Sequence, residues 1–104
     1  MAMVELSRDN FNNEIVKCNV AVIEFYSDSC NVCKMLMPVL EELSQEKSSI
    51  SFYKVNTKEN MQLCMSYRVL SLPTTLIFKN GEQTDKFSGF KAKDEVIEIL
   101  SKVL

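Results

Sequence analysis

Two cysteines three positions apart are the residues of this chain best suited to chemistry. Cys30 and Cys33 follow an apolar run and open a helical pattern. Side chains at this spacing lie on one turn of a helix, so the two sulfurs come within reach of a disulfide bond. The unpaired N–H groups and the dipole at a helix N-terminus favour a thiolate. The spacing therefore predicts a redox pair in which Cys30 attacks and Cys33, one turn further in, resolves.

Two other interpretations of the pair stay open. A zinc site would need a second such pair or histidines, but the chain has no histidine, and Cys18 and Cys64 stand alone in the sequence. The pair could also be two buried structural thiols, which is what we expect of Cys18 and Cys64. If the pair is redox-active, no metal or organic cofactor is needed, because the dithiol itself carries the electrons.

The elements that must position this pair can be derived from the hydrophobic pattern. Residues 20–26, VAVIEFY, are β-branched, aromatic and almost continuously apolar, which predicts a strand buried on both faces. The apolar residues that follow recur at helical spacing, and Pro38 within them predicts a kinked helix. They are Val32, Met35, Leu36, Val39, Leu40 and Leu43.

The rest of the chain supplies further strands and helices. Ser7 is expected to cap a helix whose shared face holds Phe11, Ile15 and Val16. Other strands are predicted at residues 3–6, 51–55, 74–78 and 83–88, the last two joined by a hairpin turn at 80–81, and other helices at 59–67 and 96–104. This order predicts an α/β fold in one domain over residues 1–104, with a central mixed β-sheet flanked by helices on both faces.

Composition narrows the classes of function. The chain has 104 residues, of which 46% are hydrophobic and 25% charged, and its net charge is −2 with both signs scattered. We therefore expect no nucleic-acid surface and no membrane span. Residues 1–6 carry neither the basic nor the apolar part of a secretory signal, so we expect a reducing cytoplasm. Paired cysteines there are catalytic or metal-binding more often than structural.

Three stretches of the sequence together resemble the thioredoxin family. VIEFYSDSCNVCKMLMPVL at 22–40 is similar to the family's strand, active site and helix, including Lys34 after the second cysteine. SLPTTLIFKNGE at 71–82 resembles its cis-proline loop, strand and hairpin, and FSGF at 87–90 resembles the end of its last strand. The resemblance implies the thioredoxin fold, a Cys30–Cys33 disulfide in the oxidised form, reduction of protein disulfides, and a cis Pro73 that faces the cysteines.

The resemblance also implies partners and a proton carrier. It implies a flavoprotein of the thioredoxin-reductase type as electron donor and disulfide-containing proteins as targets, and we expect a monomer. Glu24 interrupts the apolar strand, where burial raises the pKa of a carboxyl group. The family has an aspartate at this position that moves the proton of the second cysteine, so Glu24 is a candidate base for Cys33. Alternatively, Glu24 is a partly exposed strand carboxylate paired with Lys54, which also matches a family lysine.

The residues around the pair depart from the family pattern. Ser29 and Tyr26 replace two tryptophans, and Asn31-Val32 replaces Gly-Pro between the cysteines. An N–H group at Val32 could stabilise the Cys30 thiolate, which would make the pair less reducing than the family norm. Alternative functions are therefore an oxidant or isomerase of the same fold, or an adaptor whose thiols matter little. The surface that meets targets is expected to comprise Ser29, Asn31, Val32, Ser71, Leu72, Gly89 and Phe90.

Overall fold

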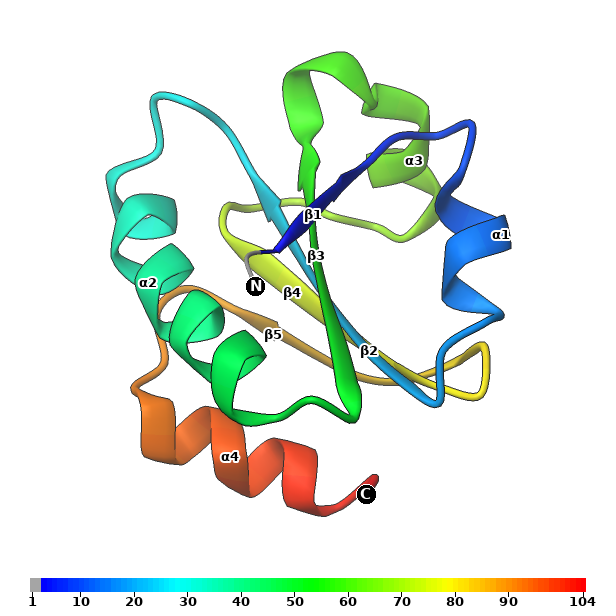
Figure 1. The fold of residues 1–104 in the computed structure, drawn as a ribbon. Helices are drawn as coiled ribbons and strands as arrows, with labels where there is room; N and C mark the ends of the chain where they lie inside the picture. The colour runs from blue at the N-terminus through cyan, green and yellow to red at the C-terminus, as the bar shows by residue number, and fades with distance from the viewer. Residues whose placement is uncertain (1–2) are drawn as a thin grey trace.

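Five strands form one mixed sheet in the computed structural model, which describes residues 3–104 (Figure 1). Their order across the sheet is β1-β3-β2-β4-β5. The strands are β1 (Val4–Leu6), β2 (Val20–Tyr26), β3 (Ile50–Asn56), β4 (Thr74–Lys79) and β5 (Glu82–Ser88). The helices are α1 (Phe11–Ile15), α2 (Asn31–Glu46), α3 (Met61–Ser66) and α4 (Lys93–Ser101), with a 3₁₀ turn at Thr57–Glu59. The predicted order of elements and the α/β fold are confirmed.

The predicted central strand is the centre of the sheet. β2 pairs in parallel with β3 on one side and antiparallel with β4 on the other. Every residue from Val20 to Phe25 is buried, as expected of a strand that is covered on both faces. The β4–β5 hairpin turns at Asn80 and Gly81, whose φ values are 52° and 86°. Positive φ at both central residues is what a two-residue hairpin turn of this kind requires.

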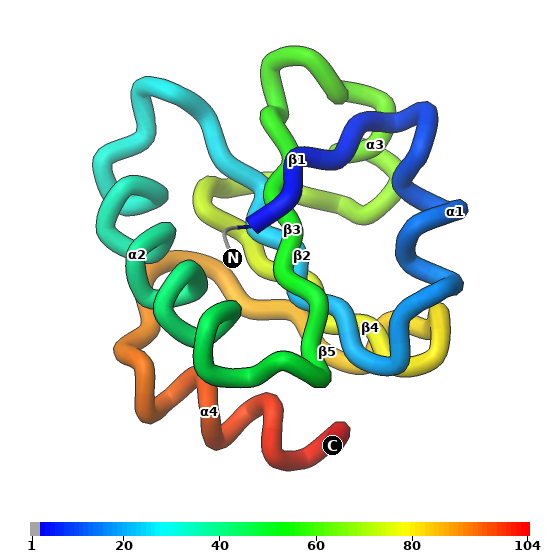
Figure 2. The backbone as a smooth tube through the Cα atoms, viewed as in Figure 1, coloured from blue at the N-terminus to red at the C-terminus, as the bar shows by residue number. Residues whose placement is uncertain are grey.

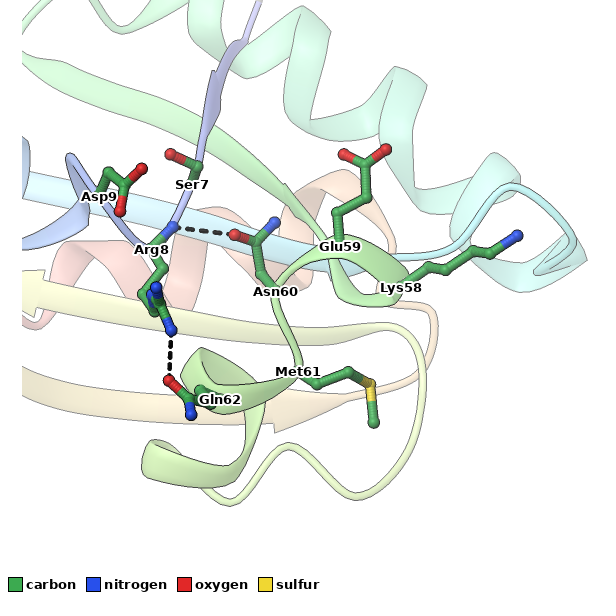
Figure 3. Close-up of a pocket in the computed structure, with 8 residues that line it drawn as sticks. All are labelled: Ser7, Arg8, Asp9, Lys58, Glu59, Asn60, Met61 and Gln62. Carbon is green, nitrogen blue, oxygen red and sulfur yellow. Dashed lines mark hydrogen bonds between the residues drawn. The ribbon is translucent and has the colours of Figure 1, made fainter.

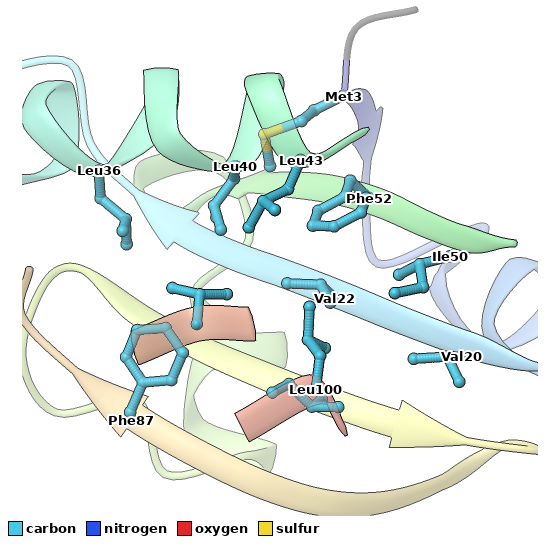
Figure 4. Close-up of a cluster of buried hydrophobic side chains, with 12 residues drawn as sticks. Met3, Val20, Val22, Leu36, Leu40, Leu43, Ile50, Phe52, Phe87 and Leu100 are labelled. Carbon is cyan, nitrogen blue, oxygen red and sulfur yellow. The ribbon is translucent and has the colours of Figure 1, made fainter. Parts of the chain in front are cut away.

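Helices cover both faces of the sheet and create two hydrophobic cores. On one face α2 and α4 lie side by side, whereas α1 and α3 cover the other face, as the tube also shows (Figure 2). The first core joins Leu36, Leu40 and Leu43 of α2 to Val22 at the sheet centre (Figure 4). The second joins Phe11 of α1 and other apolar side chains to the opposite sheet face. This two-sided packing follows from the alternation of side chains along each strand.

The buried face of α2 comprises only part of the apolar pattern seen in the sequence. Cys33, Leu36, Leu40 and Leu43 are the buried residues of this helix. Val32 and Met35, which the predicted stripe included, are 39% and 58% exposed. The apolar spacing therefore marks the helix but not its buried face at the N-terminal end, where Cys33 occupies the inward position. Pro38 lies inside the helix, as predicted.

Two details near the N-terminus of the described chain also differ from expectation. Ser7 does not cap α1, because the residue that precedes the helix is Asn10, which makes no capping hydrogen bond through its side chain. Val16 is 66% exposed, whereas Phe11 and Ile15 are buried. Helix α1 ends at Ile15, so Val16 lies beyond the face that it was expected to share. Among residues 3–104, no helix has the length and apolarity needed to cross a membrane.

Packing of α2 on the sheet should supply a large part of the stability. Leu40 is fully buried, so Leu40→Ala should lower the free energy of unfolding by about 2–5 kcal/mol through lost burial and the cavity left behind. Met35→Ala on the exposed side of the same helix is the matched control and should change it by about 0.5 kcal/mol or less. Urea denaturation measures both. Equal losses in the two variants would contradict this assignment of the buried face.

Candidate active site

The two cysteines meet at the N-terminus of α2. Cys30 is the N-cap residue of this helix, and its Cα lies 5.3 Å from that of Cys33, with which it forms a disulfide bond. The backbone N–H of Cys33 donates a hydrogen bond to the Cys30 sulfur over 3.1 Å. A sulfur at this position faces the unpaired N–H groups of the first turn, which favour negative charge once the bond is reduced. The predicted disulfide reach is confirmed.

The two sulfurs differ in their access to solvent. Cys30 is partly exposed, whereas Cys33 is 1% exposed and is the first buried residue of α2. Only the outer sulfur is therefore open to a bulky partner. In this oxidised form the N–H group that contacts the Cys30 sulfur belongs to Cys33. The contact from Val32, which concerns the thiolate form, stays a prediction.

The proline loop lies at the same edge of the sheet. Phe25 near the end of β2 is the register partner of Thr74, the first residue of β4, so Pro73 comes to the edge from which the chain continues toward Cys30. The Leu72–Pro73 peptide bond is cis, as the resemblance implied. The N–H of Gly89 donates to the Pro73 carbonyl oxygen over 2.9 Å, and this links the loop to the end of β5. That Pro73 faces the two cysteines stays a prediction.

Glu24 is buried in the middle of the sheet. It is 0% exposed, and it shares a face of β2 with Val20 and Val22, which belong to the core beneath α2. Desolvation raises the pKa of its carboxyl group to about 8, and the charge of Lys54 opposes this rise. Lys54 is the register partner of Glu24 on β3, so its side chain lies on the same face. A carboxyl group with a pKa near neutrality can both hold and release a proton at physiological pH.

The residues expected to meet a target are all accessible to solvent, at least in part. Ser29, Asn31, Ser71 and Phe90 are exposed, and the last is 44% exposed. The other members of the set, Val32, Leu72 and Gly89, are accessible at least in part. Lys34 is exposed on the first turn of α2. These positions are compatible with a surface that contacts targets, which stays a prediction.

Sequence reasoning missed one contact of the strand that leads to the dithiol. The hydroxyl group of Tyr26 donates to both carboxylate oxygens of Glu5, at 2.9 and 3.0 Å. This contact links the end of β2 to β1 across β3. Burial and the neighbouring carboxylates, Glu5 foremost, raise the pKa of Tyr26 to about 12, so the hydroxyl stays a donor. The sequence held no signal for this pairing, because it depends on the order of the strands.

The other two cysteines, Cys18 and Cys64, take no part in the disulfide bond. Cys64 is buried in the core beneath α1 and α3, where burial raises its thiol pKa. The sulfur of Cys18 lies 3.1 Å from the hydroxyl oxygen of Tyr53, in a contact that either group can donate. Within residues 3–104, no group of cysteine and acidic side chains could hold a metal ion. Neither cysteine is brought to the Cys30–Cys33 disulfide bond, so the geometry favours the dithiol over a zinc site.

A polar hollow of about 490 Å³ lies between the loop after β1 and the start of α3 (Figure 3). Arg8 connects its two sides, because its N–H donates to Asn60 over 2.9 Å and its guanidinium group donates to Gln62. Side chains of both charge signs line the hollow, including Asp9 and Lys58. None of its lining residues belongs to the site predicted from the sequence.

Comparisons with known proteins agree with this geometry. The family model described as Thioredoxin matches residues 2–102. A thioredoxin of Staphylococcus haemolyticus is 36% identical over 105 aligned positions, and one of Staphylococcus aureus is 35% identical; each alignment covers 100% of both chains. A solved structure of a mutant thioredoxin from Halobacterium salinarum superposes with a TM-score of 0.91 at 26% identity, covering 98% of this chain and 90% of that one. Thioredoxin f2 of Chlamydomonas reinhardtii gives 0.89 at 30% identity, covering 96% and 94%.

The burial of Glu24 should make stability depend on pH. Between its ordinary pKa of 4.5 and about 8, the folded protein holds a proton that the unfolded chain has lost. Raising the pH through this window therefore favours unfolding, with a slope of about 1.4 kcal/mol per pH unit for one proton. In Glu24→Gln this contribution should vanish, so the variant should gain stability over wild type as pH rises toward 8.

Urea denaturation of the oxidised protein across this window measures the effect without titration of the active-site thiols. The exposed Glu59→Gln is the control, and its stability curve should run parallel to that of the wild type. Parallel curves for Glu24→Gln and wild type would contradict the raised pKa of Glu24.

Proposed function

The chain belongs to the thioredoxin family of protein-disulfide reductases, and on that premise we propose that Cys30 is its nucleophile and Cys33 its resolving residue. The observation that carries this assignment is the difference in access: Cys30 is partly exposed, and Cys33 is 1% exposed. A target disulfide can approach the outer sulfur only. The helix N-terminus favours the Cys30 thiolate, which is the attacking form.

The exchange proceeds in two displacements. The Cys30 thiolate attacks one sulfur of the target disulfide, whose S–S bond breaks and releases one target thiolate. The Cys33 thiolate then attacks the Cys30 sulfur, which breaks the mixed disulfide and releases the second target thiolate. Two electrons pass to the target, and the Cys30–Cys33 disulfide remains. The family needs no cofactor for this reaction, because the cysteine pair is itself the redox centre.

Glu24 is the base that we assign to the second displacement. Its carboxylate takes the proton from Cys33 and passes it to the departing target thiolate or to water once the Cys30–Cys33 disulfide has formed, which a pKa of about 8 permits near neutral pH. Support comes from its position on the β2 face beneath α2, whose first buried residue is Cys33. Lys54, its register partner, favours the carboxylate and thus acts as a supporting residue.

Targets meet the surface around Cys30 in this proposal. An extended target chain lies along the loop before Pro73 and pairs with the backbone at Leu72. The side chains that would contact it belong to Ser29, Asn31, Val32, Ser71, Gly89 and Phe90. A thioredoxin-reductase-type flavoprotein would return the electrons, and the working protein would be a cytoplasmic monomer. Support for these partners comes from family membership.

Insulin reduction with dithiothreitol tests the activity. Wild type should accelerate it, and Cys30→Ser and Cys33→Ser should each abolish turnover because neither variant can complete both displacements. Cys18→Ser is the matched control and should keep activity, since Cys18 takes no part in the disulfide. A wild type without turnover would favour an adaptor function instead.

Trapping distinguishes the two cysteines. With a disulfide-containing target, Cys33→Ser should accumulate a mixed disulfide through Cys30, because attack proceeds and resolution is blocked. Cys30→Ser should accumulate far less adduct through Cys33, since the thiol of Cys33 is buried. Non-reducing electrophoresis with mass mapping of the linked residue measures both. More adduct through Cys33 than through Cys30 would reverse the assigned roles.

A further inference from the structure

Three buried oxygen atoms at the centre of the sheet make no hydrogen bond within residues 3–104. They are Oε1 and Oε2 of Glu24 and Oγ1 of Thr75. Both residues are 0% exposed, so bulk water does not reach these atoms. Leaving such groups unpaired is costly, and buried polar atoms in proteins nearly always have partners. Each oxygen therefore needs a partner that lies close at hand.

The sheet register makes the two residues neighbours. Glu24 on β2 and Thr75 on β4 are register partners, so their side chains leave the sheet on the same face. The same row continues through Lys54 on β3 to Glu5 on β1 in one direction, and to Phe87 on β5 in the other. The groups facing Glu24 are thus an ammonium group on one side and a hydroxyl group on the other. From α2, which covers this face, Cys33 is the one buried residue of the helix that gains a titratable group when the disulfide bond is reduced.

The two polar neighbours differ in what they can offer the carboxyl group. The ammonium group of Lys54 only donates hydrogen bonds, so it favours the carboxylate alone. The hydroxyl group of Thr75 rotates, so it can accept a bond from the protonated carboxyl group and donate one to the carboxylate. Phe87 offers neither. Thr75 is therefore the side chain of this row that suits Glu24 both before and after it loses its proton.

We propose that Thr75 is a positioning residue of the dithiol exchange, whose hydroxyl group bonds to the Glu24 carboxyl group in both protonation states, either after a rotation of its side chain or through one water molecule. The bond holds the carboxyl group in place while the proton moves between Glu24 and Cys33. This inference rests on the base role proposed for Glu24, but the contact between Thr75 and Glu24 can be tested independently of that role.

Titration of Glu24 by carbon-13 NMR of its carboxyl group tests the contact in the oxidised protein. Thr75→Val keeps the shape and removes the hydroxyl group. A bond to the charged form is stronger than one to the neutral form, so its loss should lower the acid dissociation constant of Glu24 by about tenfold. Thr75→Ser, which restores the hydroxyl group, should return the midpoint to that of wild type.

Two further variants keep this test decisive. Thr75→Ala also lacks the hydroxyl group and should shift the Glu24 midpoint in the same direction. It replaces Thr75→Val in the test if that variant folds poorly. Thr74→Val is the matched control, because Thr74 is equally buried but points to the opposite face, where its hydroxyl group donates to the Ser71 carbonyl oxygen over 2.6 Å. An unchanged Glu24 midpoint in Thr75→Val and Thr75→Ala, or an equal shift in Thr74→Val, would overturn the proposal.

The kinetics of resolution separate this proposal from the function on which it rests. Release of a preformed mixed disulfide on Cys30 should be about tenfold slower in Thr75→Val below the Glu24 midpoint, and the rates should converge at higher pH. Glu24→Gln should be slow throughout. If Glu24→Gln resolves as fast as wild type, the base role fails, whereas a shifted midpoint in Thr75→Val would still support the contact. A rate profile of Thr75→Val identical to that of wild type would overturn the positioning role.

Discussion

The packing of α2 on the central strand is the constraint on which the site depends. Leu36, Leu40 and Leu43 fix the helix against β2, so its N-terminus cannot move away from the end of that strand. Cys30 therefore stays near the end of the central strand, and Cys33 stays on the buried side of the first turn of α2. The difference between the two thiols is a property of how the helix is seated. Two identical residues thus acquire different chemistry from one packing arrangement.

The same packing buries the carboxyl group of Glu24 at the centre of the molecule, which costs stability. The carboxyl group of Glu24 lies under α2, although all the remaining residues of β2 from Val20 to Phe25 are apolar. Burial keeps the proton on Glu24 up to a pH of about 8, which lowers the cost of burying it at neutral pH. A leucine there would pack better and serve no proton chemistry. In the proposed mechanism, stability is given up at this position so that the carboxyl group can exchange a proton where water is excluded.

Local patterns predicted the strands well and the finer geometry less well. Residues 20–26 matched β2 to the residue because a run buried on both faces has a distinctive composition. The apolar spacing predicted α2 but did not define its buried face, because Met35 and Val32 are apolar yet face solvent, while the inward position holds Cys33. The cysteine pair was evident from its spacing, whereas the cis bond before Pro73 came from family resemblance. Nothing in the sequence distinguished Thr75, because its importance arises from a register between strands distant in the chain.

The separation of β2 and β4 in the chain also affects the order in which the parts of the site form. β4 joins the sheet beside β2, although α2, β3 and α3 separate the two strands in the chain. Contacts between such distant segments form late, because a long loop must close first. During synthesis, the segment with both cysteines emerges well before the strand that completes their surroundings. In a nascent chain the two thiols are therefore present before Glu24 is buried and before the proline loop has emerged. The cysteines are open to any oxidant until β4 docks.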